Sequence, residues 1–330
     1  AAYIPFSALV STRKEGPLLQ QLSNKVPYLF LNKKGKIGWS AVFKLRSFVK
    51  KNKIDIIHAH STSFLTALLV KLTYSNVKVI WHDHHGNRVH KKGNTNLFLK
   101  KVSFLFEGVL VVNQELAVWA KNNLSTKKVL YFPNFISTVS NSGTQDTFLK
   151  GLEGKRIVFL ANLKNPKNHM QILQAFVKSE ALAMGWSLHL IGKDYSDSYS
   201  DELKQFISKN GLQNSIFIYD SCNDIEAILG QCSIGILGST YEGFPVTLLE
   251  YGKASLCVLS TKVGYCSTII KHLENGLVFN PNHIEEIVEH LNLLLSNDKI
   301  RIQYAAALHQ KVMNHYSDKA IINSYLEWLK

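Results

Sequence analysis

The sequence predicts an α/β protein in which two doubly wound domains follow each other along the chain. Short apolar runs alternate with helical patterns almost throughout, which is typical of parallel sheets covered by helices on both faces. The alternation lapses once, between Pro133 and Lys155, where the chain is rich in Ser, Thr, Asn and Gly. The length of 330 residues also suits two domains of about 150 residues each.

The first half contains four strand candidates separated by helical patterns. Its apolar runs are nearly continuous, as strands buried on both faces must be. The predicted strands cover residues 54–60, 77–84, 108–113 and 128–133, and the helical patterns cover 39–52, 63–74, 97–107 and 114–124. We therefore expect a first domain over residues 1–135.

The second half repeats this organisation after a polar segment, residues 136–154, which we interpret as an interdomain linker. Residues 155–315 are expected to form the second domain, and the last helix, within 316–330, to pack back onto the first. The predicted strands are 155–162, 186–193, 215–220, 233–239, 255–260 and 276–279, and the predicted helices are 167–180, 200–210, 223–231, 246–252, 283–296 and 298–314.

Composition and charge narrow the function classes. No apolar run approaches the ~20 residues that span a bilayer, so we expect a cytoplasmic protein. The four cysteines lack C-x-x-C spacing and histidines at zinc-finger distance, which favours reduced thiols over a metal site. No G-x-G-x-x-G follows a strand and there is no P-loop, which argues against a nicotinamide or flavin dehydrogenase.

The net charge of +14 favours anionic partners such as nucleotide phosphates or acidic lipid headgroups. A solvated basic surface without a partner is the alternative, since the lysines are spread along the chain. Nucleic acid is not expected as a partner, because no strand carries a row of aromatic and basic residues.

The stretch STYEGFPVTLLEYG, residues 239–252, is the strongest candidate for a site. It follows a buried strand and leads into a helix, and ligands of open α/β sheets bind where such loops begin. Two carboxylates eight positions apart, Glu242 and Glu250, could hold separated parts of one extended ligand. The alternative interpretation is structural: Glu242 is an acid that the helix dipole favours at the amino end of the helix, and Glu250 is an acid on the helix surface. Because the helix around Glu250 is largely apolar, that side chain needs a partner.

This stretch resembles the E-x7-E signature of retaining glycosyltransferases of family 4, which have the GT-B fold of two Rossmann-like domains facing each other across a cleft. The resemblance implies that Glu242 contacts the donor sugar. It also implies that Gly243, Phe244 and Pro245 line the sugar pocket, and that Glu250 binds the ribose hydroxyls through its two oxygens.

The segment IVFLANLKNPKNHMQILQAF resembles the part of the same family that binds the donor diphosphate. Lys167 matches the lysine of that segment, and Asn162 stands where an arginine is usual. Lys164, two places later, is the candidate for the second positive charge. Positive charge at this place would stabilise the diphosphate as it leaves. Taken alone, KNPKN would be interpreted as a solvated turn.

Two further segments, IDIIHAHS and KVIWHDHHG, resemble strands of the first domain in this family. The second ends in a histidine that contacts the donor sugar or stabilises charge in the transition state. We match that histidine to His84, with His85 as the alternative, while His58 and His60 are expected to be structural.

Two segments of the second domain also resemble the family. LSTKVGYCSTIIKHLENGLVF resembles the loop that faces the donor, with Gly264 at one of its glycines. Tyr265 and Thr268 depart from the usual glycine and acid, which predicts unusual sugar selectivity. IYDSCNDI, residues 218–225, resembles the loop around the nucleotide base.

The resemblance implies an enzyme that transfers a sugar from a UDP- or GDP-linked donor to an acceptor hydroxyl with retention of configuration. Polysaccharide, lipopolysaccharide or glycolipid synthesis is the expected setting, with a saccharide or lipid-linked acceptor. Peripheral contact with the inner face of the cytoplasmic membrane is expected too. No D-x-D motif follows a strand, so we expect no metal and no cofactor.

Two alternatives stay open. The chain could be a catalytically degenerate GT-B binding module, given Asn162 and the start of the sequence near what would be the second strand of a typical member. That start predicts that the first strand and glycine-rich loop, about 40–50 residues, are absent from this sequence. A GT-B nucleotide-sugar epimerase is the other alternative, although the first domain is poor in acids.

Overall fold

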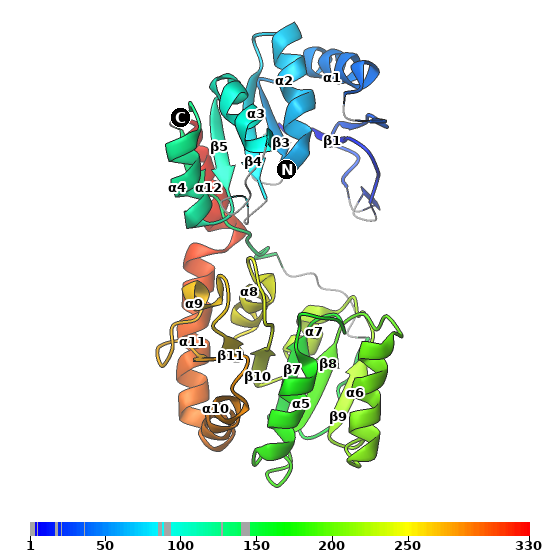
Figure 1. Ribbon diagram of the computed structural model, residues 1–330, viewed down its shortest axis with the longest axis vertical. Coiled ribbons are helices and arrows are strands. Elements are labelled where there is room, and N and C mark those ends of the chain that lie inside the picture. Colours follow the sequence, from blue (N-terminus) through cyan, green and yellow to red (C-terminus); the bar gives the residue numbers. More distant parts are fainter. Residues whose placement is uncertain are drawn as a thin grey trace. The chain divides into compact units, whose positions relative to one another are not determined.

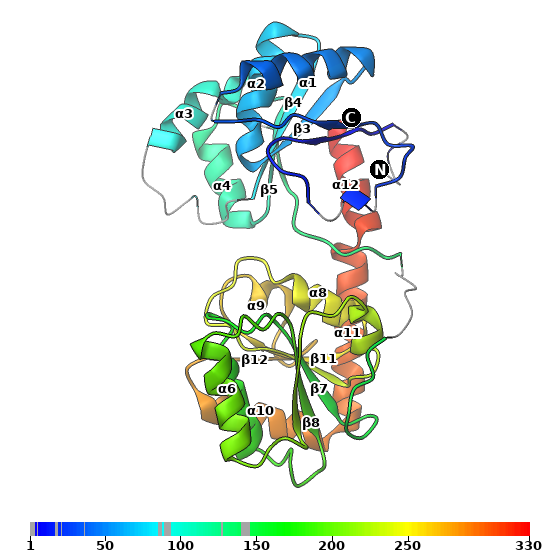
Figure 2. The ribbon, with the colours of Figure 1, turned by 90° about the vertical axis from the view of Figure 1, so that its right-hand side faces the viewer.

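The computed structural model describes residues 4, 6–16, 19–20, 22–35, 37–84, 88, 94–126, 128–139 and 146–330. The chain divides into two compact units, shown in Figure 1 and, turned by 90°, in Figure 2. Unit 1 comprises residues 1–133 and 322–330, and unit 2 comprises residues 134–321. Each unit contains a parallel sheet with helices packed against it, as the alternation of patterns predicted.

Unit 1 is built on a four-stranded parallel sheet in the order β3-β4-β5-β6, beside a separate parallel pair, β1-β2. All four residues of β5 are buried, which explains why this strand is continuously apolar. The elements are β1 (Leu9–Ser11), β2 (Tyr28–Phe30), α1 (Trp39–Lys51), β3 (Ile56–His60), α2 (Phe64–Thr73), β4 (Lys78–Asp83), α3 (Asn94–Val102), β5 (Gly108–Val111), α4 (Gln114–Asn123) and β6 (Val129–Tyr131).

Unit 2 is built on a six-stranded parallel sheet in the order β12-β11-β10-β7-β8-β9. The strands are β7 (Arg156–Leu160), β8 (Ser187–Ile191), β9 (Ile216–Tyr219), β10 (Ile234–Leu237), β11 (Cys257–Thr261) and β12 (Leu277–Phe279). Because β8 and β10 lie on opposite sides of β7, the strand order reverses between β7 and β10. Such a reversal opens a crevice at the carboxyl ends of the two strands, where ligands bind.

The helices of unit 2 fall close to their predicted positions, with a short helix, α9, that was not predicted. They are α5 (His169–Lys178), α6 (Ser198–Lys209), α7 (Ile225–Leu229), α8 (Val246–Lys253), α9 (Cys266–Ile269), α10 (Ile284–Ser296) and α11 (Asp298–His315). A final helix, α12 (Asp318–Leu329), begins in unit 2 and has its last residues in unit 1.

The tyrosine that follows Glu250 fixes α8 against the sheet. Tyr251 is fully buried, and its hydroxyl accepts a hydrogen bond from Leu160 N at 2.8 Å. The same hydroxyl donates to the carbonyl oxygen of Ile236 at 3.1 Å. Since Leu160 ends β7 and Ile236 lies in β10, this side chain ties α8 to both strands at the reversal.

The last residues of the predicted linker, 146–154, instead pack on unit 2. Leu149 is 5% exposed within a hydrophobic core of that unit. The backbone N–H groups of Asp146 and Thr147 donate to Asp224 Oδ2 at 2.9 and 2.7 Å, and Leu149 N donates to Gln231 Oε1 at 3.0 Å. Polar composition therefore marked this segment as irregular, but its side chains and backbone bind the domain that follows.

The end of α12 packs within unit 1. The Trp328 ring lies where a side chain at Gly108, the first residue of β5, would stand only 2.4 Å from it. Tyr325 is 6% exposed and packs against the Phe132 ring, with centroids 5.6 Å apart. These contacts account for the grouping of residues 322–330 with the first part of the chain.

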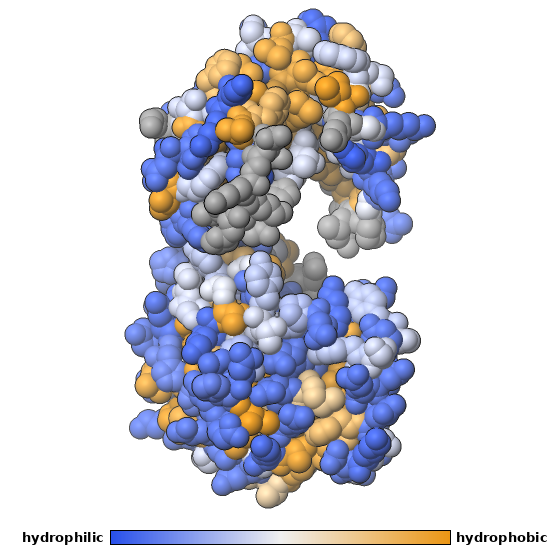
Figure 3. All heavy atoms as spheres, viewed as in Figure 1, coloured by the Kyte–Doolittle hydropathy of each residue, from blue (hydrophilic) through white to orange (hydrophobic). Residues whose placement is uncertain are grey.

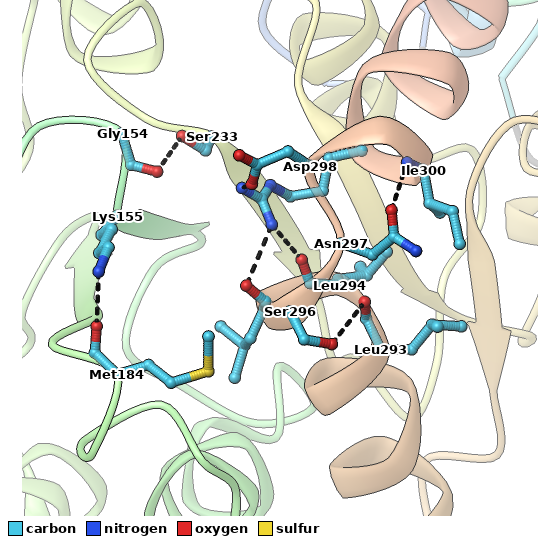
Figure 4. A network of polar contacts seen from close by, with 12 residues as sticks. Gly154, Lys155, Met184, Ser233, Leu293, Leu294, Ser296, Asn297, Asp298 and Ile300 are labelled. Carbon is cyan, nitrogen blue, oxygen red and sulfur yellow. Dashed lines mark hydrogen bonds and ion pairs between the residues drawn. The ribbon is translucent and has the colours of Figure 1, made fainter.

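Polar groups at the amino-terminal edge of the unit 2 sheet bind one another, as Figure 4 shows. Ser233 Oγ donates to Gly154 O at 2.8 Å, and Lys155 Nζ donates to Met184 O at 3.0 Å. Arg301 of α11 donates to the carbonyl oxygen of Leu295 at 3.2 Å, at the end of α10. These contacts join elements of the fold to one another. Ligands of open α/β sheets bind at the carboxyl ends of the strands, so the site is sought at that edge.

Candidate functional site

The candidate site is built from the two loops that follow β7 and β10, on either side of the strand reversal. Thr240 N, in the loop after β10, donates to Pro166 O, in the loop after β7, at 2.9 Å. This backbone contact joins the segment that carries Lys167 to the segment that carries Glu242. The two stretches chosen from the sequence are thus adjacent in space.

Glu242 makes the central polar contact of these loops. Lys167 Nζ and Ser239 Oγ each lie 2.6 Å from Glu242 Oε1. The Glu242 side chain is 11% exposed and that of Lys167 is 25% exposed, so the ion pair is largely shielded from water. Both donors bind one oxygen, and Glu242 Oε2 has no hydrogen-bond partner within the described residues.

A third loop, around Gly264 after β11, contacts the loop after β10. Gly264 has a positive φ of 54°, and a Cβ there would lie 1.9 Å from the carbonyl oxygen of Glu242. Tyr265 N donates to Gly243 O at 3.3 Å, and the Tyr265 and Phe244 rings lie 5.5 Å apart. Gly264 therefore brings the loop into backbone contact with Glu242, while Gly243 itself is exposed with open space beside it.

Pro245 is the N-cap of α8, and Glu250 is the fifth residue of that helix, as expected. Glu250 is half-buried, and burial raises the pKa of its carboxyl. The partner predicted for it is not found, because its side chain makes no hydrogen bond or ion pair with any residue that the structure describes. A glutamate in this setting has unused acceptor capacity.

Glu250 lines a cavity of about 480 Å³ in unit 2. Asn223, Asp224 and Ile225 also line it, so the predicted base-binding loop, residues 218–225, meets Glu250 at one cavity. Lys253 and Glu226 form an ion pair of 3.2 Å on its wall. The cavity is large enough for part of a small-molecule ligand.

The two other polar residues predicted after β7 have different surroundings. Lys164 is exposed and its ammonium lies 5.7 Å from the centre of the Tyr195 ring. Asn162 Oδ1 accepts a hydrogen bond from the backbone N–H of Lys193 at 3.0 Å. Asn162 therefore orders the turn after β8. It does not supply the positive charge that an arginine, the usual residue of the family at this position, would have.

Two residues that the sequence analysis did not select belong to the site. Ser239, fully buried, shares Glu242 Oε1 with Lys167. Lys193 lies two residues past the end of β8, where its backbone N–H binds Asn162, and its ammonium lies 5.1 Å from the centre of the Tyr195 ring. A lysine at the carboxyl end of a buried strand was the available signal for Lys193, but nothing in the sequence distinguished Ser239 from its neighbours.

In unit 1 the predicted histidine, His84, follows β4 and belongs to a cluster of rings. His60 Nδ1 lies 2.9 Å from His84 Nε2, and the His82 and His84 ring centroids are 3.9 Å apart. His58 stacks on His60 with centroids 4.5 Å apart, so both side chains expected to be structural join the same cluster. The alternative to His84, His85, lies outside the described residues.

Burial and repulsion between neighbouring imidazoles favour the neutral forms of His58, His60 and His82. Together they lower the pKa of His58 to about 3 and that of His82 to about 2, in each case mainly through burial. Asp83 lies between His82 and His84 in the sequence, and its buried carboxylate pairs with Arg88, with Nη2 and Oδ1 3.1 Å apart. The acid at the end of β4 is therefore compensated, and histidines dominate this edge.

Residues 145–310 match the family model of glycosyl transferases group 1, and residues 8–139 match that of glycosyltransferase family 4. The first match alone spans half of the chain. The chain therefore belongs to this family of glycosyltransferases, as the E-x7-E stretch predicted, and it is an enzyme of that class.

Curated relatives agree with the family. An uncharacterized glycosyltransferase of Haemophilus influenzae is 24% identical over 291 residues, which are 85% of this chain and 76% of that protein. A UDP-Gal:alpha-D-GlcNAc-diphosphoundecaprenol alpha-1,3-galactosyltransferase of Escherichia coli is 21% identical over 330 residues, 92% of this chain and 84% of that protein.

Solved structures show the same fold. A glycosyltransferase of Rickettsia africae aligns with a TM-score of 0.78 at 17% identity, covering 98% of this chain and 90% of its own. The Anabaena protein HepE in complex with UDP aligns with a TM-score of 0.76 at 16% identity, covering 94% and 88%. The prediction of the GT-B class is confirmed.

Replacing Gly264 with alanine should destabilise unit 2, because the added Cβ would collide with Glu242 O at a residue with positive φ. The expected loss in the free energy of unfolding is about 1–3 kcal/mol. Gly243→Ala is the matched control, since a Cβ there meets nothing within 4 Å. Urea titration followed by circular dichroism compares them, and equal losses in both variants would contradict the contact.

Replacing Glu250 with glutamine should not lower the free energy of unfolding of the free protein at pH 7. It should raise that free energy by up to about 1 kcal/mol. The folded pKa of Glu250 is raised, so its stabilising contribution is complete below the ordinary pKa of glutamate and is lost as pH rises. The gain in Glu250→Gln should therefore be larger at pH 7 than at pH 4. The control is Glu289→Gln, an exposed residue of α10 beyond its first turn, whose substitution should change the free energy of unfolding at neither pH.

Proposed function

We propose that this chain transfers a sugar from a UDP-linked donor to an acceptor hydroxyl with retention of configuration. The observation that carries the proposal is the pairing of Glu242 with Lys167 at the strand reversal, beside the helix that presents an unpartnered Glu250. UDP is favoured over GDP because the E. coli relative is named for UDP-Gal and the HepE structure contains UDP.

In this proposal Glu250 accepts hydrogen bonds from the ribose hydroxyls, which would supply the partner that its carboxylate lacks. The cavity that it shares with the loop at residues 223–227 takes the uracil base. Glu242 uses its second oxygen, Oε2, toward the donor sugar, with the exposed Gly243 leaving room beside it. Phe244, Pro245 and Gly264 form the supporting wall.

Charge on the leaving diphosphate is the main electrostatic problem of such a reaction. We assign its stabilisation to Lys167, with Lys164 and Lys193 as exposed cations on the neighbouring turns. These lysines take the role that a divalent cation has in other phosphate-leaving reactions. The resemblance assigns His84 to the donor sugar or to charge in the transition state, and a donor phosphate oxygen would accept the proton of the acceptor hydroxyl, so that no protein base is assigned.

The acceptor class follows from the relatives. Besides the E. coli enzyme, a relative from Campylobacter jejuni is named for an acceptor linked to diphospho-undecaprenol, and one from Erwinia amylovora for amylovoran biosynthesis. We infer a saccharide or lipid-linked acceptor in the synthesis of a cell-envelope polysaccharide, at the cytoplasmic face of the membrane.

The surface of unit 1 supports contact with that membrane. No helix among the described residues combines the length and apolar character needed to cross a bilayer. Trp39 and Phe43, one turn apart on α1, are 57% and 54% exposed, and Lys44, Lys50 and Lys51 are exposed on the same helix. Figure 3 shows apolar residues at the surface of unit 1 over α1 and α2, beside hydrophilic ones. Aromatic and basic side chains on one helix suit an anionic membrane surface.

The donor proposal predicts that calorimetric titration detects micromolar binding of UDP to the whole chain and much weaker binding of GDP. Glu250→Gln should weaken UDP binding at least about tenfold, since ribose hydrogen bonds to a charged group contribute roughly 1.5–3 kcal/mol. Glu285→Gln, exposed on α10, is the control and should bind UDP as the natural chain does. Equal affinities of all three proteins would contradict the role of Glu250.

Activity then separates the alternatives. Transfer from a UDP-sugar to a lipid-linked saccharide, with the anomeric configuration of the product read by NMR, supports the proposed function. Binding of UDP without transfer to any acceptor would favour a catalytically degenerate binding module. Conversion of the UDP-sugar itself, without an acceptor, would favour an epimerase.

The membrane proposal predicts salt-sensitive sedimentation of the chain with vesicles of anionic phospholipid, and little with phosphatidylcholine alone. Each of Lys44, Lys50 and Lys51 replaced by glutamine should weaken binding about fivefold, from the ~1 kcal/mol per basic residue near such a surface. Lys299→Gln, an exposed lysine of unit 2, is the control and should bind as before. Binding that is insensitive to salt and to all three substitutions would contradict the role of α1.

A further inference from the structure

Four histidines gather at the carboxyl edge of the unit 1 sheet. His58 and His60 lie two residues apart on β3, so their side chains project from the same face of the sheet. His60 pairs in register with His82 of the neighbouring strand, β4, and His84 follows two residues later. The alternation of side chains along paired strands thus brings the four rings together.

Three of these histidines are close enough to share one ion. One ring nitrogen from each of His58, His60 and His82 lies within 4.8 Å of the ring nitrogens of the other two. His58 Nε2 and His82 Nδ1 are 3.3 Å apart. Two nitrogens on a tetrahedral zinc ion, each about 2.0–2.1 Å from it, would stand about 3.3–3.4 Å apart. The closest pair already has the required separation.

The surroundings of the three rings resemble those of bound imidazoles. The Tyr325 hydroxyl lies 3.5 Å from His58 Nδ1, and His84 Nε2 lies 2.9 Å from His60 Nδ1. Metal-bound histidines commonly use their second ring nitrogen in such contacts, which fix the ring orientation. His82 is 4% exposed, and its Nδ1 faces His58 Nε2 rather than solvent.

We propose that His58, His60 and His82 form a binding site for one divalent transition-metal ion, with Zn²⁺ the best match. Imidazole nitrogens suit zinc, copper and nickel, whereas magnesium and calcium prefer oxygen ligands. Three protein ligands leave a fourth position for water or another small ligand. The site departs from the sequence-based expectation of no metal. It lies wholly in unit 1, so it does not depend on the donor role proposed for unit 2.

The test is calorimetric titration of the whole chain with Zn²⁺ after treatment with a chelator. We expect one zinc ion per chain at micromolar or tighter affinity, and a visible absorption band of tetrahedral type when Co²⁺ is added instead. His60→Gln should weaken zinc binding at least about tenfold, because even the loss of a group that only supports a metal ligand typically weakens binding about 10–100-fold. His60 is exposed, so this variant should stay folded.

His290→Gln is the matched control, because His290 and His272 form a separate close pair in unit 2, with ring centroids 5.2 Å apart. It should bind zinc as the natural chain does. Zinc should also raise the thermal unfolding temperature of the natural chain by more than that of His60→Gln. The proposal is overturned if a chain shown by circular dichroism to be folded binds no zinc at micromolar concentration. It is also overturned if His60→Gln binds zinc as tightly as His290→Gln.

Discussion

The ion pair between Lys167 and Glu242 is the interaction on which the candidate site depends. The two residues follow different strands, β7 and β10, whose connections lead to opposite sides of the sheet. The pair holds these diverging loops together, and Ser239 shares the same carboxylate oxygen. Without Lys167, a carboxylate that is 11% exposed would lose its counter-charge, and buried unpaired charges are costly. The remaining oxygen, Glu242 Oε2, is thereby kept in a fixed place.

The two glutamates of one short segment differ because their surroundings differ. Glu242 has a lysine and a serine, whereas Glu250, one helix turn beyond the start of α8, has no polar partner among the described residues. Burial without a partner raises the pKa of Glu250 and reduces the stability of the free protein at neutral pH. A residue that costs stability in the free protein is a reasonable place to look for function. Tyr251 offsets part of that cost by anchoring the helix to two strands.

Much of the fold could be predicted from the sequence because its parallel strands are buried on both faces and are therefore continuously apolar, as in β5 and β10. The spacing from Glu242 to Glu250 pointed to the candidate site because both residues lie within one loop and the helix that follows it. Contacts between distant segments were not predictable in this way. Ser239 gains its role only from the fold, Asn162 orders the turn at Lys193, and residues 146–149 bind Asp224 and Gln231 rather than forming a free linker.

The contact between Trp328 and Gly108 has a consequence for how the chain is made. Residues 322–330 emerge from the ribosome after all other parts of unit 1, with the whole of unit 2 between them. Domains generally fold as units during synthesis. Unit 2 therefore has its complete sequence while unit 1 still lacks the helix end that covers β5. During that interval the surface around Gly108 is open, and unit 1 is the part of the nascent chain that needs protection from aggregation.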